Sequence, residues 1–241
     1  MSFLSNYDID LQTVLNHCND GCLLELQSSL GHFLDNYPST EIIDTRIRDR
    51  YQNTLLIISA TLGYENIVSW LLQQEGILVN SKNMEGSTAL ISACTNGNGR
   101  IVSILLGDIG IDPNLVDNEG ISALSSSISY NEIDIVRKLL SHEGVNRDIQ
   151  DKSGDTPLYY ACYYEYFECV KILLTHSLKA VDPNIRNNDG RIPLFCALAK
   201  GNVEISKFLY KFHTEKDLQI QDNEGVSLES LAKELYFKYQ R

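Results

Sequence analysis

Cationic residues are scarce in this sequence. Lysine and arginine number 20 against 32 aspartates and glutamates, which gives 241 residues a formal net charge of −12. Proteins that bind the phosphate backbone of nucleic acids, or anionic membrane surfaces, need clustered cations. We therefore expect neither nucleic acid nor membrane among the partners of this chain.

Long apolar runs are missing too. No segment approaches the roughly 18 apolar residues of a transmembrane helix, and the first twelve residues, MSFLSNYDIDLQ, lack the basic start and apolar run of a signal peptide. The six cysteines show no CxxC spacing, so nothing supports a metal site or a disulfide framework. Free thiols fit a reducing compartment. The expected location is therefore the cytoplasm, and the nucleus is left open.

The sequence also lacks a catalytic constellation. Gly97-Asn98-Gly99-Arg100 carries two glycines, as a phosphate-binding loop would, but the later glycine of such a loop is missing and no strand pattern precedes it. The five histidines form no pairing of a nucleophile with a base. We expect no enzymatic activity, no catalytic residue, no metal and no cofactor.

What the sequence does contain is a repeated unit of one turn and two short helices. Its clearest copy is 151–174, where Gly154 supplies a turn and Thr156-Pro157 begins a helix as its cap and first helical residue. The turn glycine stands two residues before the capping position in every copy except the first, which has Gln52. Because helices this short are marginal alone, the copies must pack on one another. The capping positions are Thr54, Thr88, Ser122, Thr156, Ile192 and Ser227.

The chain resembles the ankyrin-repeat family from about residue 48 to its C-terminus. A period near 33 residues with a turn and two helices is that family's pattern, and Gly154, Thr156-Pro157-Leu158, Ala161 and Leu173-Leu174 match its core positions. The resemblance implies an all-α fold, an ankyrin-repeat solenoid of helix-turn-helix units with short turn or hairpin fingers. We expect a single domain over 1–241. It would consist of an N-terminal capping unit (1–48), five repeats (49–221) and a C-terminal capping unit (222–241).

The chain also departs from the family's pattern. The glycine that ends the first helix is kept as Gly63, Gly97 and Gly201, but Asn131 and Glu165 stand there in the other two copies. Asparagine tolerates the left-handed backbone of such a position, and glutamate does so less readily.

The resemblance places a partner protein on the concave surface, made of the turn tips and the exposed positions of the first helices. The tip residue before the turn glycine is acidic in four of six copies. Stacked tips would then form an acidic ladder that binds a basic partner, or the acidic tips only keep this edge of the protein solvated. Exposed tyrosines beside these tips favour an apolar anchor for the partner protein. Tyr159 and Tyr160 are assigned to packing between helices, and Trp70 to a buried position of its second helix. The candidate protein-binding residues are Tyr51, Leu62, Glu85, Glu119, Tyr130, Tyr163, Tyr164, Asp189 and Lys200.

The function expected from these patterns is a monomeric, non-enzymatic scaffold that binds a protein with a basic surface. In length, repeat number and the segment 190–199, GRIPLFCALA, the chain is similar to gankyrin-type proteasome-assembly chaperones, which implies that role. The alternative is a regulatory effector or inhibitor that occludes an enzyme or a transcription factor.

Overall fold

The computed structural model describes residues 6–36, 47–175, 181–214 and 217–239. These ranges are helical, with single β-bridges such as those of Arg48 with Thr54 and Gln221 with Ser227, and no strand that belongs to a sheet. The expected all-α fold of helix-turn-helix units is confirmed. The chain packs as two compact units, Met1–Asn118 and Glu119–Arg241. The expected single domain with its capping and repeat boundaries stays a prediction.

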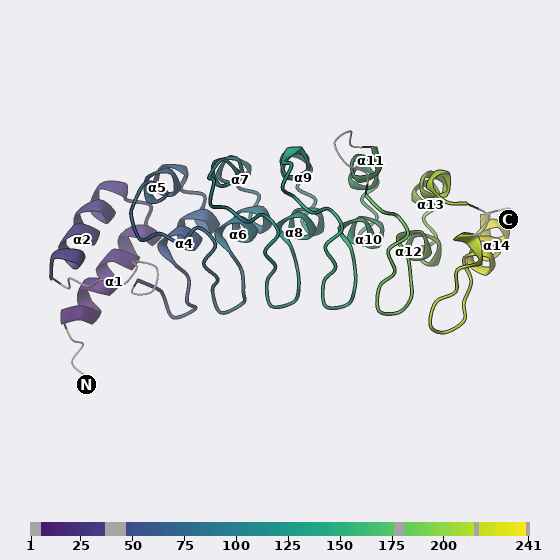
Figure 1. Cartoon of the computed structure of the whole chain (residues 1–241), viewed down its shortest axis with the longest axis horizontal. Helices are drawn as coiled ribbons and strands as arrows, with labels where there is room; N and C mark the ends of the chain where they lie inside the picture. The colour runs from purple at the N-terminus through teal and green to yellow at the C-terminus, as the bar shows by residue number, and fades with distance from the viewer. Residues whose placement is uncertain (1–5, 37–46, 176–180, 215–216, 240–241) are drawn as a thin grey trace. The chain divides into compact units, whose positions relative to one another are not determined.

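Helix pairs make up the described part of the first unit. The first helix of one pair packs on the first helix of the next, since α1 contacts α4 and α4 contacts α6, and α5 likewise contacts α7. Figure 1 shows these two rows, with the turn segments projecting from the row of first helices. The helices are α1 (Asn6–Asn19), α2 (Leu23–Asn36), α4 (Leu55–Leu62), α5 (Glu65–Leu71), α6 (Ala89–Thr95) and α7 (Gly99–Leu106).

The second unit follows the same plan. Its first helices α8, α10 and α12 pack in succession, and α14 packs on α12. Within this unit too, the turns project on the side of the first helices (Figure 1). The elements are α8 (Ala123–Ser129), α9 (Ile133–Ser141), α10 (Pro157–Tyr163), α11 (Phe167–Thr175), α12 (Pro193–Lys200), α13 (Val203–Leu209), the 3₁₀ turns η1 (Tyr210–Phe212) and η2 (Asp217–Gln219), and α14 (Leu228–Tyr239).

Hydroxyl caps begin the first helices, as the sequence predicts. The side-chain oxygen of Thr156 accepts a hydrogen bond from the backbone N–H of Tyr159 at 3.2 Å, which satisfies a donor that the helix itself leaves free. The oxygens of Thr54, Thr88 and Ser122 accept in the same way. Ile192 has no such oxygen, and α12 begins instead with Pro193, which has no N–H to satisfy.

Among the residues that the structure describes, left-handed backbone occurs at three that are not glycine, Gln52, Asn131 and Glu165, with φ of 63°, 57° and 61°. Each stands where other copies of the repeat carry glycine. The departure at Glu165 therefore leaves the backbone path unchanged, although a side chain there raises the conformational energy. Its carboxylate oxygen Oε2 accepts a hydrogen bond from the Asn202 side chain at 2.9 Å, which ties this turn to the next helix pair of the second unit.

We call the turn before a first helix a finger, and several fingers are closed by their own first side chain. In the finger 151–155, Oδ1 of Asp151 accepts from the backbone N–H groups of Ser153 and Asp155, each at 2.8 Å. Neighbouring fingers of one unit are joined by a backbone hydrogen bond to the carbonyl of the tip residue. These bonds run from Met84 to Tyr51 and Asn118 to Glu85 in the first unit, and from Lys152 to Glu119, Asn188 to Ser153 and Asn223 to Asp189 in the second.

Leucine side chains of the second helices fill the core between helix pairs, and Leu173 of α11 is fully buried. We expect Leu173→Ala to lower the free energy of unfolding by about 2–5 kcal/mol, because it removes buried apolar atoms and leaves a cavity. Urea denaturation followed by circular dichroism measures the change. An unchanged midpoint would show that Leu173 does not occupy a core position.

Close approach between fingers gives a second prediction, tested by a matched pair. Gly154 and Gly225 both have φ near +80°, so alanine at either costs about 1–2 kcal/mol for the left-handed backbone. At Gly154 a Cβ would also lie 2.8 Å from the backbone nitrogen of Asn188, whereas at Gly225 it would meet no atom within 4 Å.

Gly154→Ala should therefore lower the free energy of unfolding by about 1–3 kcal/mol more than Gly225→Ala, the usual cost of overpacking. Urea denaturation of the two variants side by side measures the difference. Equal losses would mean that the fingers do not pack as closely as described.

Candidate protein-binding site

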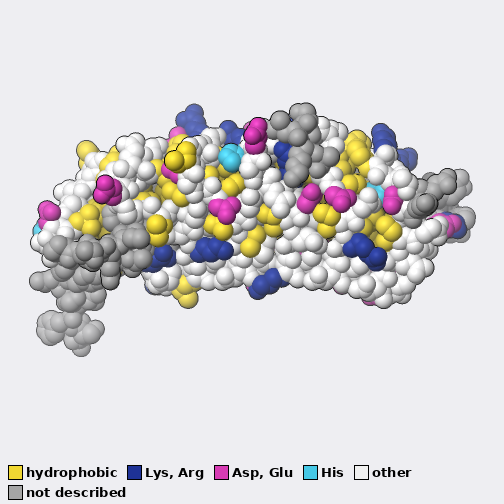
Figure 2. Space-filling view, in the orientation of Figure 1, with side chains coloured by type: hydrophobic (Ala, Val, Ile, Leu, Met, Phe, Trp, Pro, Cys, Tyr) yellow, Lys and Arg dark blue, Asp and Glu magenta, His cyan; other side chains and the backbone are white. Residues whose placement is uncertain are grey.

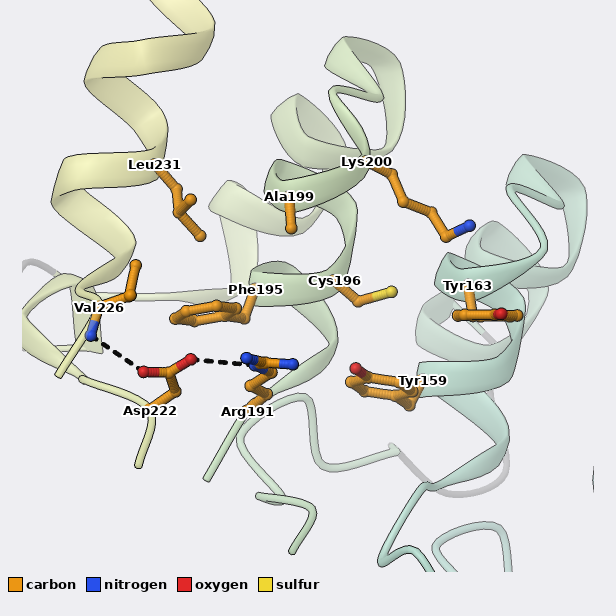
Figure 3. Close-up of a pocket in the computed structure, with 10 residues that line it drawn as sticks. All are labelled: Tyr159, Tyr163, Arg191, Phe195, Cys196, Ala199, Lys200, Asp222, Val226 and Leu231. Atoms are coloured by element: carbon orange, nitrogen blue, oxygen red, sulfur yellow. Dashed lines mark hydrogen bonds and ion pairs between the residues drawn. The ribbon is translucent and has the colours of Figure 1, made fainter. Parts of the chain in front are cut away.

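An open groove of about 350 Å³ lies in the second unit, between α10, α12 and the start of α14. Aromatic rings form much of its wall: Tyr159 and Tyr163 come from α10, and Phe195 from α12. Leu231 of α14 faces them from the other side (Figure 3). A concave, mostly apolar surface with a few charged groups is the usual form of a binding site.

One cation of the groove, Arg191, is already neutralised. Its Nε lies 3.0 Å from Oδ2 of Asp222, and its two terminal nitrogens each lie 3.5 Å from a carboxylate, of Asp189 and of Glu224. The guanidinium also lies 5.6 Å from the ring centroid of Phe195. With three carboxylates around it, Arg191 has little attraction left for a ligand's negative charge.

Asp222 keeps its charge although its side chain is fully buried. Burial by itself raises the pKa of a carboxyl. The backbone N–H groups of Val226 and Glu224 oppose this by hydrogen-bonding the charged form. The guanidinium of Arg191 also donates a hydrogen bond to it and attracts it by its positive charge. The balance lowers the pKa of Asp222 below its usual value. The pair thus fixes the base of the groove, as Figure 3 shows.

The other cation, Lys200, has a different environment. Its Nζ lies 4.2 Å from the ring centroid of Tyr163, which is a cation–π contact across neighbouring helix pairs. Figure 3 shows the side chain reaching from the end of α12 toward that ring. Among the described residues, no carboxylate lies within salt-bridge distance of this ammonium group.

Tyrosines cluster at the end of α10. The rings of Tyr163 and Tyr164 meet edge to face, with centroids 5.2 Å apart, and Tyr164 stacks between Tyr160 and Tyr166 at 6.2 and 5.7 Å. Tyr163 and Tyr164 remain 49% and 40% exposed. The cluster therefore offers a rigid, partly exposed aromatic surface, which suits an interface anchor.

The hydroxyls of Tyr159 and Tyr160 and the thiol of Cys196 stay neutral in this region. Burial raises the pKa of Tyr159 and Tyr160 well above the usual value, and the bond from the Tyr160 hydroxyl to Oδ2 of Asp151, at 2.7 Å, raises the pKa of Tyr160 further. Burial also raises the pKa of the Cys196 thiol to about 11. A protonated thiol is a poor nucleophile, so Cys196 contributes wall surface to the groove.

The candidate residues of the second unit are exposed as expected, and only some of them lie together. Tyr163, Tyr164 and Lys200 form one contact group, and Asp189 joins the groove through Arg191. Tyr130 is 59% exposed just after α8. The tip residue Glu119 lies 3.6 Å from Lys152. Glu119, Asp189 and Glu224 thus all have cationic partners, which offsets part of the predicted acidic ladder.

The first unit holds the remaining candidates. Tyr51 and Glu85 are exposed at finger tips, with Arg50 4.7 Å from the Tyr51 ring centroid, and Leu62 is exposed at the end of α4. Tyr51 and Glu85 are linked through their fingers, because Met84, beside Glu85, donates its N–H to the Tyr51 carbonyl at 3.0 Å.

Sequence reasoning missed part of the groove. Tyr159, assigned to packing between helices, is half-buried and lines the groove, so that assignment was incomplete. Arg191 and Phe195 were not among the predicted binding residues. Tyr159 and Phe195 both stand three residues after a capping position in consecutive copies, and this aromatic pair was the available signal. Tyr160 is half-buried too, with its ring stacked on Tyr164 and its hydroxyl bonded to Asp151.

No group of three or more histidine, cysteine, aspartate or glutamate side chains among the described residues could hold a metal ion. None of the described helices is both long enough and apolar enough to cross a bilayer.

The comparisons with known proteins agree with the fold. The family model "Ankyrin repeats (3 copies)" matches residues 18–117 and 109–187. The chain is similar to the ankyrin repeat domain of Bcl-3, described as a unique member of the IkappaB protein family, with TM-score 0.78 and 19% identity over 91% of this chain and 92% of that one. It is also similar to EF0377, an ankyrin repeat protein, with TM-score 0.72 and 25% identity over 84% and 98%. No curated protein sequence matches the chain.

The pairing of Arg191 with Asp222 predicts a pH effect. A carboxyl whose pKa is lowered by folding adds stability above the pKa of the unfolded chain, about 3.9, and loses it as the pH falls through the folded value. Arg191→Met removes one source of that lowering while Asp222 stays buried. We expect the pKa of Asp222, measured by carboxyl-carbon NMR titration, to rise, and acid unfolding to begin at higher pH.

Lys152→Met is the matched control, because Lys152 pairs with the exposed Glu119 and no contact joins it to Asp222. It should leave the titration of Asp222 unchanged. An unaltered pKa of Asp222 in Arg191→Met would mean that the backbone N–H groups alone hold the carboxylate charged.

Proposed function

Because the chain belongs to the ankyrin-repeat family, a family of protein–protein interaction scaffolds, we propose that it binds a partner protein without catalysing a reaction. The observation that carries this proposal is the exposed contact group Tyr163, Tyr164 and Lys200 beside the groove. Preorganised aromatic surface loses little conformational entropy when it is covered. The binding face of the second unit is then formed by its first helices and fingers.

The charge of the finger tips favours a partner with a basic surface. The tips Glu119, Asp189 and Glu224 outnumber the cations Lys152 and Arg191 that pair with them, so the finger edge of the second unit keeps a negative balance. On the face shown in Figure 2, Lys and Arg side chains are interspersed with Asp and Glu, and no block of one sign covers it. We infer that charge steers the encounter with the partner and that the aromatic group holds the complex.

The biological role that we propose is that of a cytoplasmic or nuclear monomer acting like a gankyrin-type proteasome-assembly chaperone. What supports it is the similarity in length, repeat number and segment 190–199. A regulatory inhibitor that occludes an enzyme or a transcription factor is the second candidate, and an exposed anchor beside a groove would serve it equally well. Proteasomal ATPase subunits as the captured partner would favour the first role, and a single signalling enzyme the second.

Removing the anchor tests the proposal. We expect Tyr164→Ala to weaken binding of the captured partner by about 2 kcal/mol or more, mainly through faster dissociation, because central desolvated contacts set complex lifetime. Affinity capture from cell extract identifies the partner, and surface plasmon resonance gives both rate constants.

Phe212→Ala serves as the control, since Phe212 is also an exposed aromatic residue but lies after α13, in the row of second helices. It should bind the partner like the unmodified chain. Equal binding by Tyr164→Ala, with the fold intact, would move the interface away from the first helices of this unit.

A further inference from the structure

The groove contains two cations in contrasting states. Arg191 is surrounded by Asp189, Asp222 and Glu224, whereas Lys200 has an aromatic ring beneath it and, among the described residues, no carboxylate within salt-bridge distance. Lys200 is thus the one cation of the groove lining that has no described carboxylate within salt-bridge distance. It stands beside an apolar wall, where a charge pair is stronger than in open water.

This arrangement favours one kind of occupant. An apolar side chain gains by covering the exposed parts of Tyr163 and the rings behind it, since burial of apolar surface is favourable. A carboxylate next to that side chain can reach Lys200 while the ammonium stays over the ring of Tyr163. A cationic neighbour at the same place would be repelled by Lys200.

We propose that the groove binds a short segment of the partner in which an aromatic or large aliphatic residue is followed by a carboxylate. The apolar side chain occupies the space between α10 and α12, and the carboxylate pairs with Lys200. This proposal rests on the proposed function and adds the chemistry of the recognised segment. It differs from the basic surface expected opposite the fingers, because here a single acidic group is recognised within the groove.

Lys200 also has a structural role to be separated from recognition. It is the last residue of α12, where a positive charge interacts favourably with the helix dipole. That role predicts a small loss of stability when the charge is removed, and it predicts no preference among ligands. Ligand preference is therefore the informative readout.

Three capped hexapeptides serve as probes: acetyl-GSFESG-amide, acetyl-GSFQSG-amide and acetyl-GSFKSG-amide. Each is titrated into the full ¹⁵N-labelled chain, and the amide shifts of Tyr163, Phe195 and Lys200 are followed by NMR. The net charge of −12 by itself favours the lysine peptide. The groove predicts the opposite order, with the glutamate peptide bound about three- to tenfold more tightly than the lysine peptide, the range of an exposed to partly buried ion pair.

Charge reversal sharpens the test. In Lys200→Glu the order should invert, so that the lysine peptide binds more tightly than the glutamate peptide. Lys207→Glu is the matched control: it makes the same charge change at an exposed position of α13 outside the groove lining, and it should keep the original order. Ala199→Phe, at an exposed position of the lining, should weaken all three peptides by filling the groove.

Two results would overturn the proposal: equal binding of the three peptides, or the same order in Lys200→Glu as in the unmodified chain. Either could occur while Tyr164→Ala still weakens the natural partner, in which case the proposed function stands and only the recognised chemistry is wrong. Conversely, if Tyr164→Ala bound the natural partner as tightly as the unmodified chain does, the proposed function would be contradicted even if the glutamate peptide bound best.

Discussion

Packing between neighbouring helix pairs is the interaction on which this structure depends. Most of the helices from α4 to α13 span only seven to nine residues, a length at which nucleation costs more than the internal hydrogen bonds return in water. Their stability therefore comes from apolar side chains such as Leu105 and Leu173, which are fully buried within their units. Each pair is folded because its neighbour is folded, as in other repeat proteins.

The fingers add a second, polar link between neighbouring pairs. An aspartate or asparagine closes each of several fingers on itself, as Asp49, Asn83 and Asp151 do, and the tip carbonyl then accepts an N–H from the next finger of the same unit. This spacing leaves no room for a Cβ at Gly154. The glycine of the turn is thus required by the approach of another backbone as well as by its own conformation.

The groove follows from this arrangement. The first helices α10 and α12 pack side by side, so Tyr159 and Tyr163, three and seven residues after the cap Thr156, line the groove together with Arg191 at the end of the next finger. Arg191, at the end of one finger, forms an ion pair with Asp222 of the next finger. Lys200, the last residue of α12, lies over the Tyr163 ring of α10. The site is built across neighbouring copies, which suits recognition of an extended surface.

Much of the fold could be predicted from the sequence because its signals are local. Caps such as Thr156, turn glycines such as Gly154, and the repeat interval depend on backbone preferences within a few residues, and the same register places Tyr163, Tyr164 and Lys200 on an exposed side. The register also shows that Glu165 occupies a glycine position, but the structure decided that its backbone stays left-handed, because packing of the neighbouring pair outweighs the residue's own preference.

Contacts between side chains of different copies were decided only by the tertiary structure. That Tyr159 lines a groove, that Arg191 is neutralised by Asp222 and Glu224, and that Lys200 lies over a tyrosine ring all depend on side-chain directions across residues 31 to 37 positions apart. Spacing along the chain places such residues on the same face. Which of them touch is set by rotamers and by the distance between helix axes, which a repeat pattern does not specify.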